Sequence, residues 1–374
     1  MWNFIKALSI FVGTIIGVGI FGLPYVTMQA GFPVVLFYFL MLTGVAIAIH
    51  LMYGEISLAT KSLHRLPGLV GEYMGPRWKN FTLWIFMLGL LGALLAYLIV
   101  GGKFLNLFFS PYFGGSEAIY TLIFWAIGTL LIFQGIRSIA IIEITLLLVF
   151  FGLLALFFVK TTPFIAVDNF QNIDWKFFAL PYGVVLFSLW GSDMIPEVKE
   201  VLGKDGRAML KWVLISGISL AALTYLFFIY IIFGATGSQT SKEAIAGLVQ
   251  VAGNGIIRTG FIFGIITCFT SFLTLGLTLK KGLWYDQGLN PHLSWFIACF
   301  LPLFLFFAGL RAFIDIIGLT GAVAIGLVGI IIVLLYKKFL WVEFNRKMNP
   351  FFYFFGLFFV IGIFLEIFYF VYAK

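Results

Sequence analysis

The chain has 374 residues, of which 62% are hydrophobic and only 10% are charged, and it carries a net charge of +8. A soluble globular protein carries about 25% charged residues, so a water-soluble fold has too little interior to hide this much apolar surface, and lipid must cover the rest. The positive charge does not indicate a nucleic-acid-binding protein, because the basic residues are scattered between apolar runs rather than gathered in one patch.

Long uncharged runs predict the fold class. Residues 7–49 contain no Asp, Glu, Lys or Arg, and a helix needs about 20 apolar residues to cross a bilayer, so this run alone predicts two spans. Lipid offers the backbone no hydrogen-bond partner, which leaves helices or a closed barrel. Barrel strands alternate apolar and polar residues, whereas runs such as residues 139–159 do not. We therefore predict an all-α polytopic membrane protein.

The apolar runs and the connectors between them predict about eleven spans within one transmembrane domain, residues 1–374. The spans are expected at residues 4–28, 34–58, 81–107, 118–136, 139–160, 176–200, 209–234, 257–282, 293–309, 314–336 and 350–372. Most of the 23 Lys and Arg fall in one set of connectors, which places the N-terminus in the cytoplasm, and an odd number of spans then places the C-terminus outside. We expect a multi-pass protein of the cell membrane.

Spans one and six contain matching interruptions. Residues 17–24 hold glycines and a proline at mid-membrane depth, and residues 188–196 hold a glycine, small polar residues, an acid and a proline. Both compositions weaken a helix. A glycine-rich span alone is more typical of close helix packing, but two interruptions five spans apart are typical of transporters with inverted repeats. The pattern predicts repeats at about 4–160 and 176–336, an extra helix at about 350–372, and a central binding site.

The residues at these interruptions also carry a family resemblance. Residues 13–24, GTIIGVGIFGLP, resemble the first-span motif of the amino acid/auxin permease group of the amino acid-polyamine-organocation superfamily. Within that group, the likeness is to bacterial aromatic amino acid permeases for tyrosine and tryptophan. It continues through Ala96 and Tyr97, residues 187–191, residues 270–277 and residues 300–303. It implies a LeuT-like five-plus-five inverted repeat with one extra helix, and a secondary transporter that carries an amino acid.

The breaks predict how such a substrate binds. We expect its carboxylate to meet backbone amides near Gly17 and Gly19, and its ammonium group to meet carbonyls of residues 188–191, because broken helices expose these groups at their dipole ends. Capture of a zwitterion by backbone buries no unpaired side-chain charge. The predicted substrate-binding residues are Thr14, Gly17, Gly19, Tyr97, Ser188, Trp190, Gly191 and Asp193.

Ionisable residues inside spans are functional hypotheses by default. Asp193 departs from the resemblance, as does Glu197, since neutral residues are expected there in tyrosine and tryptophan carriers. We expect Asp193 to face an aqueous path, because an acid at mid-span costs about 2.5–3.5 kcal/mol. His50 is interpreted as a satisfied packing residue, and Glu366, outside the repeats, is not expected to act in transport.

A second group predicts an ion site. Thr267, Thr270 and Ser271 are spaced i, i+3 and i+4, so their hydroxyls share one helical face. In the implied fold that face looks at the first break, where Gly13 and Ile16 offer carbonyls, and the oxygens together suit sodium. The alternative is that each hydroxyl bonds back to its own helix. Because the permeases it resembles are generally proton-driven, the coupling ion is predicted to be a proton, with sodium as the alternative.

No motif indicates an enzyme, a metal or a cofactor, since HExxH, paired-cysteine, P-loop and nucleophile-elbow patterns are absent from the sequence. The expected partners are a small amino acid and the lipid bilayer, without nucleic acid or an obligate protein partner. Two alternative functions stay open. An ion channel would need rings of charge or filter loops, and a non-transporting membrane sensor with a transporter-like fold would usually carry a soluble signalling domain.

Overall fold

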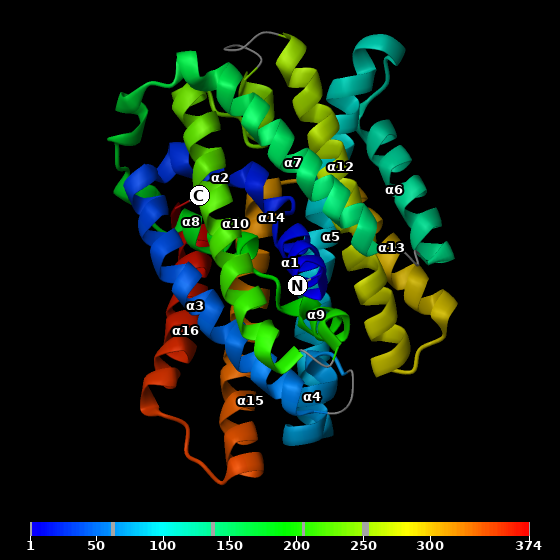
Figure 1. Ribbon diagram of the computed structural model, residues 1–374. Helices are drawn as coiled ribbons and strands as arrows, with labels where there is room; N and C mark the ends of the chain where they lie inside the picture. Colours follow the sequence, from blue (N-terminus) through cyan, green and yellow to red (C-terminus); the bar gives the residue numbers. More distant parts are fainter. Residues whose placement is uncertain (1, 61–63, 136–138, 204–205, 249–253, 374) are drawn as a thin grey trace.

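Helices form nearly all of the regular structure in this computed structural model, which describes residues 2–60, 64–135, 139–203, 206–248 and 254–373. They pack side by side as one bundle, with α1 in its middle (Figure 1). Among the described residues, eight helices are long and apolar enough to cross a membrane, and a bent pair makes a ninth span. The predicted all-α membrane fold is therefore confirmed.

Most helices follow one another along the chain with short connections, and the longer ones join α7 to α8 and α10 to α12. Their bounds are α1 Trp2–Ile15, α2 Gly19–Ala30, α3 Phe32–Ala59, α4 Leu66–Met74, α5 Pro76–Phe113, α6 Glu117–Gln134, α7 Ile139–Thr161, α8 Leu180–Ser188, α9 Ile195–Leu202, α10 Gly206–Thr236, α12 Asn254–Lys281, α13 Pro291–Phe307, α14 Phe313–Leu319, α15 Gly326–Phe344 and α16 Tyr353–Phe368. Short 3-10 turns lie in the α7–α8 and α10–α12 connections. The end of the bundle that carries α4 lies opposite the α7–α8 connection (Figure 1).

Each predicted span overlaps one of these helices or helix pairs. The number eleven stays a prediction, because α13 has only 17 residues and the sixth span is split into the short helices α8 and α9. The division into two inverted repeats also stays a prediction. One feature was not anticipated: the tenth span contains a π-helical turn, Thr320–Ile325, between α14 and α15.

The predicted interruptions of spans one and six are present. Helices α1 and α2 meet at an angle of 50°, and the Gly17 amide turns back to the Ile15 carbonyl at 2.8 Å instead of continuing the α-helical ladder. Helix α8 ends at Ser188, and a 3-10 turn, Ser192–Met194, leads into α9. Because α1 packs against α9 and α2 packs against α8, the two breaks lie together inside the bundle.

The helices on the rim of the bundle present apolar side chains outward. Leu130 on α6, Leu148 on α7 and Phe364 on α16 are each more than half exposed. Large apolar side chains in such positions are expected where lipid is the solvent. Helices α2 and α8 are by contrast mostly buried, as is the middle of α5, so the core of the bundle surrounds the breaks.

Candidate functional site

A cavity of about 60 Å³ lies against both breaks, which is room for a few water molecules. All eight residues predicted to bind substrate line it: Thr14, Gly17, Gly19, Tyr97, Ser188, Trp190, Gly191 and Asp193. The rest of the wall comes mainly from α5, the sixth span and the tenth span: Ile15, Phe86, Gly89, Leu90, Ala93, Phe187, Leu275, Ala324, Ile325 and Val328. The tertiary structure thus brings the predicted residues together, while their roles in binding stay predictions.

The four helix ends at the breaks give this cavity an uneven electrostatic character. Helices α1 and α8 end here with their carbonyl groups, whereas α2 and the turn before α9 begin here with their amides. Terminal carbonyls and amides lack partners within their own helices, and the helix dipoles add partial negative and positive charge at those ends. The cavity can therefore accept a group with separated charges without using a charged side chain for each pole.

Two glycines at the first break have no space for a side chain. A Cβ atom at Gly17 would overlap the Tyr97 hydroxyl, and a Cβ atom at Gly19 would overlap the side chain of Ser188. The Ser188 hydroxyl itself donates to the Val184 carbonyl at 2.7 Å. Glycine is thus required at both positions by close approach of α5 and α8, in addition to its effect on the helix.

Tyr225 on α10 joins the two breaks and is a residue that the sequence did not predict for the site. Its hydroxyl lies 2.5 Å from the Ile15 carbonyl and 2.9 Å from the Ser188 carbonyl. The side chain is fully buried. It is one of 15 tyrosines in the chain and lies in an uninterrupted span, so no local signal marks it. Its contacts hold the carbonyl ends of the first and sixth spans at a fixed separation.

His50 on α3 contacts the second break from behind. The Gly191 amide donates to Nε2 of His50 at 3.0 Å, and Nδ1 lies 2.7 Å from the Ala46 carbonyl. The imidazole is fully buried and makes an edge contact with Trp190 at 5.0 Å between ring centroids. Both ring nitrogens therefore have hydrogen-bond partners, which agrees with the interpretation of His50 as a packing residue. One of these partners, the Gly191 amide, belongs to the backbone of the cavity wall.

Polar contacts close the bundle at the end that carries α4. Arg65, just before α4, forms an ion pair with Glu197 on α9 at 2.5 Å. Lys199 on α9 donates to the carbonyls of Ser57 and Thr60 at the end of α3, the latter at 2.8 Å. Helix α9 is therefore held to the end of α3 and the start of α4 by charge-assisted bonds.

Aromatic side chains pack on the other side of the first break. Phe21 on α2 makes edge contacts with Phe104 on α5 at 5.0 Å, Phe263 on α12 at 6.0 Å and Phe228 on α10 at 6.3 Å between ring centroids. All four rings are buried. Rings thus pack on one side of the breaks, whereas one ion pair and the bonds of Lys199 lie toward the α4 end of the bundle.

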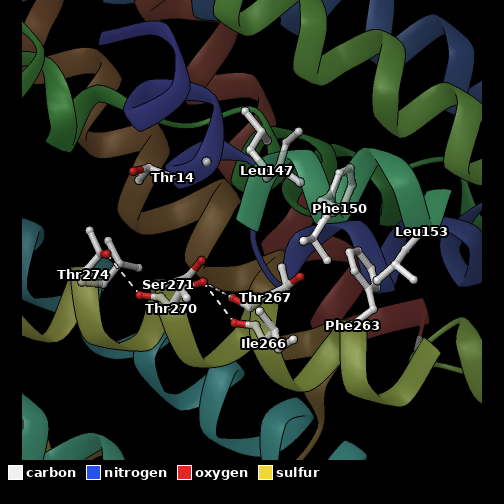
Figure 2. Close-up of a pocket in the computed structure, with 14 residues that line it drawn as sticks. Thr14, Leu147, Phe150, Leu153, Phe263, Ile266, Thr267, Thr270, Ser271 and Thr274 are labelled. Atoms are coloured by element: carbon white, nitrogen blue, oxygen red, sulfur yellow. Dashed lines mark hydrogen bonds between the residues drawn. The ribbon is translucent and has the colours of Figure 1, made fainter. Parts of the chain in front are cut away.

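A second cavity of about 40 Å³ lies between α1, α7 and α12. The five residues predicted to bind an ion line it: Gly13, Ile16, Thr267, Thr270 and Ser271. Figure 2 shows the hydroxyl-bearing residues along α12 on one side and apolar side chains such as Leu147 and Phe150 of α7. The Thr270 hydroxyl bonds back to carbonyls of its own helix, at 3.1 Å to Ile266, which is the alternative arrangement that the sequence analysis considered.

Among the described residues, no group of three or more His, Cys, Asp or Glu stands together to hold a metal. A bundle of apolar helices that is broken twice at its centre around a small cavity is the architecture of a membrane transporter. The chain belongs to the tryptophan/tyrosine permease family, whose model matches residues 2–371. It is accordingly an integral membrane permease and not an enzyme, and the family resemblance inferred from residues 13–24 is confirmed.

Solved transporters of low sequence identity share the fold. MhsT in complex with L-phenylalanine is 17% identical, with a TM-score of 0.69 over 100% of this chain and 98% of that chain. Mhp1, a nucleobase-cation-symport-1 family transporter in a closed conformation with bromovinylhydantoin bound, is 13% identical, with a TM-score of 0.69 over 98% of this chain and 91% of that chain.

The manganese transporter of Eremococcus coleocola, in complex with an aromatic bis-isothiourea substituted compound, is 13% identical. Its TM-score is 0.67, over 98% of this chain and 86% of that chain. At these identities the likeness establishes the LeuT-type fold alone. No curated protein sequence matches the chain at a significant level.

Proposed function

We propose that this permease is a secondary active transporter that imports an amino acid, of the aromatic or large neutral class, by alternating access. The observation that carries the proposal is the cavity between the two breaks, because both chemical poles that an amino acid zwitterion needs meet there as helix ends. The carboxylate binds at the amides near Gly17 and Gly19, and the ammonium group binds at the carbonyls at the end of α8.

The side-chain part of the cavity supports the substrate class. Its wall contains the rings of Phe86, Tyr97, Phe187 and Trp190, together with aliphatic and small residues. Aromatic walls favour flat or bulky apolar groups, since ring pairs contribute about 0.5–1.5 kcal/mol beyond area burial. A protein of the same fold was solved with L-phenylalanine, and membership of the tryptophan/tyrosine permease family points the same way.

Alternating access would use the two sets of covering contacts. Breaking the Arg65–Glu197 pair and the Lys199 bonds frees α9 and opens the cavity toward the end that carries α4. Separating the rings around Phe21 opens it toward the opposite end. The excess of Lys and Arg in the connectors supports placing the N-terminus in the cytoplasm, so the α4 end would be the cytoplasmic one, in the cell membrane.

For the coupling ion we propose a proton, with sodium in the second cavity as the alternative. The permeases that residues 13–24 resemble are generally proton-driven, which supports the proton. At the second cavity the Thr270 hydroxyl donates to a carbonyl of its own helix, α12. This bond argues against Thr270 as a ligand of sodium there. Thr267 and Ser271 still line that cavity beside the end of α1.

Uptake of a panel of labelled amino acids into proteoliposomes tests the proposal. A proton gradient without sodium and a sodium gradient at fixed pH are imposed separately. We expect a proton gradient to drive accumulation of tryptophan, tyrosine or phenylalanine above the other amino acids. Conductance without saturable uptake would instead indicate a channel, and the absence of both uptake and conductance would indicate a sensor. Stimulation by sodium that is lost in Ser271→Ala would assign the coupling to the second cavity.

A further inference from the structure

The hydrogen bonds of His50 fix its protonation state in this structure. The Ala46 carbonyl can only accept and the Gly191 amide can only donate. Nδ1, at 2.7 Å from Ala46, must therefore carry the hydrogen, and Nε2, at 3.0 Å from Gly191, must be unprotonated. One neutral tautomer satisfies both bonds, and the charged imidazolium cannot, because it is a donor at both nitrogens.

Protonation would therefore act directly on the cavity wall. A proton on Nε2 places a donor against the donor of Gly191, so the bond between α3 and the second break is lost. Gly191 and its neighbour Trp190 both line the cavity between the breaks, and Trp190 contacts the imidazole edge-on. The imidazole is fully buried and lies directly behind these residues, so a proton would reach it from the cavity side.

The positive charge would also sit at an unfavourable helix end. Gly191 precedes the turn Ser192–Met194 that begins the second half of the sixth span. The start of a helical segment carries partial positive charge, so an imidazolium there repels that half of the span. The same half-span is held to the end of α3 by Lys199 and near α4 by Glu197. The bond between His50 and Gly191 is thus one of several contacts that must break before α9 can move.

Other ionisable groups lie on the helices that pack around His50, and each makes contacts of its own. On the sixth span they are Asp193, which lines the cavity, and Glu197, which pairs with Arg65. The side of the imidazole facing α1 meets the ring of Phe11, at 5.9 Å between centroids.

From α10, the neighbouring titratable group is Tyr225, whose hydroxyl bonds the carbonyls of the two breaks. On α3 itself they are Tyr53, which is buried, and Glu55, which accepts from Tyr336 of α15 at 2.7 Å. Gly191 and the adjacent Trp190 ring are therefore the contacts through which a change of charge on His50 reaches the substrate site.

We propose that Nε2 of His50 is the proton-binding site of this transporter, and that binding of the proton releases the Gly191 backbone and so couples proton occupancy to the substrate cavity. The inference rests on the proposed transport function and locates its coupling step. Linkage requires that the coupling be reciprocal, so substrate binding must change the proton affinity of His50 by the same factor.

The variant His50→Gln separates coupling from binding. The glutamine amide oxygen can accept from the Gly191 amide but cannot take up a proton near neutral pH. In proteoliposomes with labelled L-tryptophan and L-tyrosine, we expect wild-type protein to perform both counterflow, which needs no gradient, and accumulation driven by a proton gradient. His50→Gln should lose at least about tenfold of the gradient-driven accumulation, and any counterflow that remains should no longer depend on pH as it does in wild-type protein. His292→Gln, at an exposed histidine, is the matched control and should keep both activities.

A variant that accumulates substrate under a proton gradient as wild type does would overturn the inference. Loss of both activities in His50→Gln is resolved by a measurement that needs no transport. With His64 and His292 replaced by glutamine, His50 is the only histidine of the 3 in the chain, and nitrogen NMR of its ring reads the protonation of Nε2. We expect Nε2 to take up a proton within the pH range in which the protein stays folded, at a midpoint that shifts on addition of L-tryptophan.

An Nε2 that stays unprotonated over this range, with and without substrate, would show that His50 only positions the backbone. Failure of the proposed function looks different: wild-type protein would then show neither counterflow nor accumulation for any amino acid, whatever the ring nitrogen does.

Discussion

The hydroxyl of Tyr97 lies where a side chain at Gly17 would begin. Tyr97 comes from the middle of α5 and Gly17 from the first break, and both line the cavity between the breaks. The missing side chain at Gly17 therefore lets a buried hydroxyl from another helix approach the unwound backbone, besides allowing the helix to break there.

Gly17→Ala should lower transport at least about tenfold, because the added methyl group must displace the Tyr97 hydroxyl from the cavity wall, and overpacking of this kind costs about 1–3 kcal/mol. The measurement is counterflow by purified protein. The double variant with Tyr97→Phe should recover part of the loss, since the overlapping atom is then absent. Gly44→Ala is the control, because nothing lies within 4 Å of its Cβ position. Equal losses for Gly17→Ala and Gly44→Ala would contradict the explanation.

Gly19→Leu should abolish transport while the protein still inserts into the membrane. The leucine side chain would collide with Ser188 of α8 and favour a continuous helix through the break. The measurement is uptake into proteoliposomes made from variant protein that remains monodisperse in detergent. Wild-type rates in well-folded variant protein would show that the break at this position is dispensable.

Tyr225→Phe should slow counterflow about 5- to 150-fold, the range that corresponds to about 1–3 kcal/mol. Removal of the hydroxyl leaves the Ile15 and Ser188 carbonyls without the group that joins them. Tyr230→Phe on the same helix is the matched control, since that side chain is 43% exposed. The idea fails if the two phenylalanine variants behave alike.

Reversal of the charges at the α4 end should show whether transport depends on the Arg65–Glu197 ion pair itself or only on the charge of each residue. Arg65→Glu or Glu197→Arg alone places like charges together near α9 and should reduce transport strongly. The double reversal restores an ion pair and should recover much of the rate. If the double variant is as poor as the single ones, the pair does not govern access to the cavity.

Asp193→Asn should change the pH profile of uptake, because Asp193 lines the cavity and is the acid closest in sequence to the second break. Asp193 lies in the cavity wall, and the expectation that it faces an aqueous path stays a prediction. Asp168→Asn, in the exposed connection between α7 and α8, serves as the control. An unchanged pH profile and substrate range in Asp193→Asn would make this acid a structural residue.

The chain's local chemistry determined the spans and the breaks. Apolar runs must become helices in lipid whatever their neighbours are, because no other structure satisfies the backbone there. Glycines and prolines at residues 17–24 and 188–196 weaken a helix from within, so both interruptions could be predicted without knowing what surrounds them. The same segments carried part of the family resemblance, and six of the eight predicted binding residues that line the cavity lie in them.

Only the tertiary structure decided which distant side chains complete the site. Tyr225 reaches a carbonyl 210 positions away, and His50 meets an amide 141 positions away. Such contacts depend on how each helix is rotated and how closely it packs, and one apolar helix in lipid has no sequence period strong enough to fix its rotation. His50 was interpreted from sequence as a packing residue because the sequence around a single histidine in a span does not indicate which group the imidazole contacts. The identity of that partner, a backbone amide in the cavity wall, follows from helix packing alone.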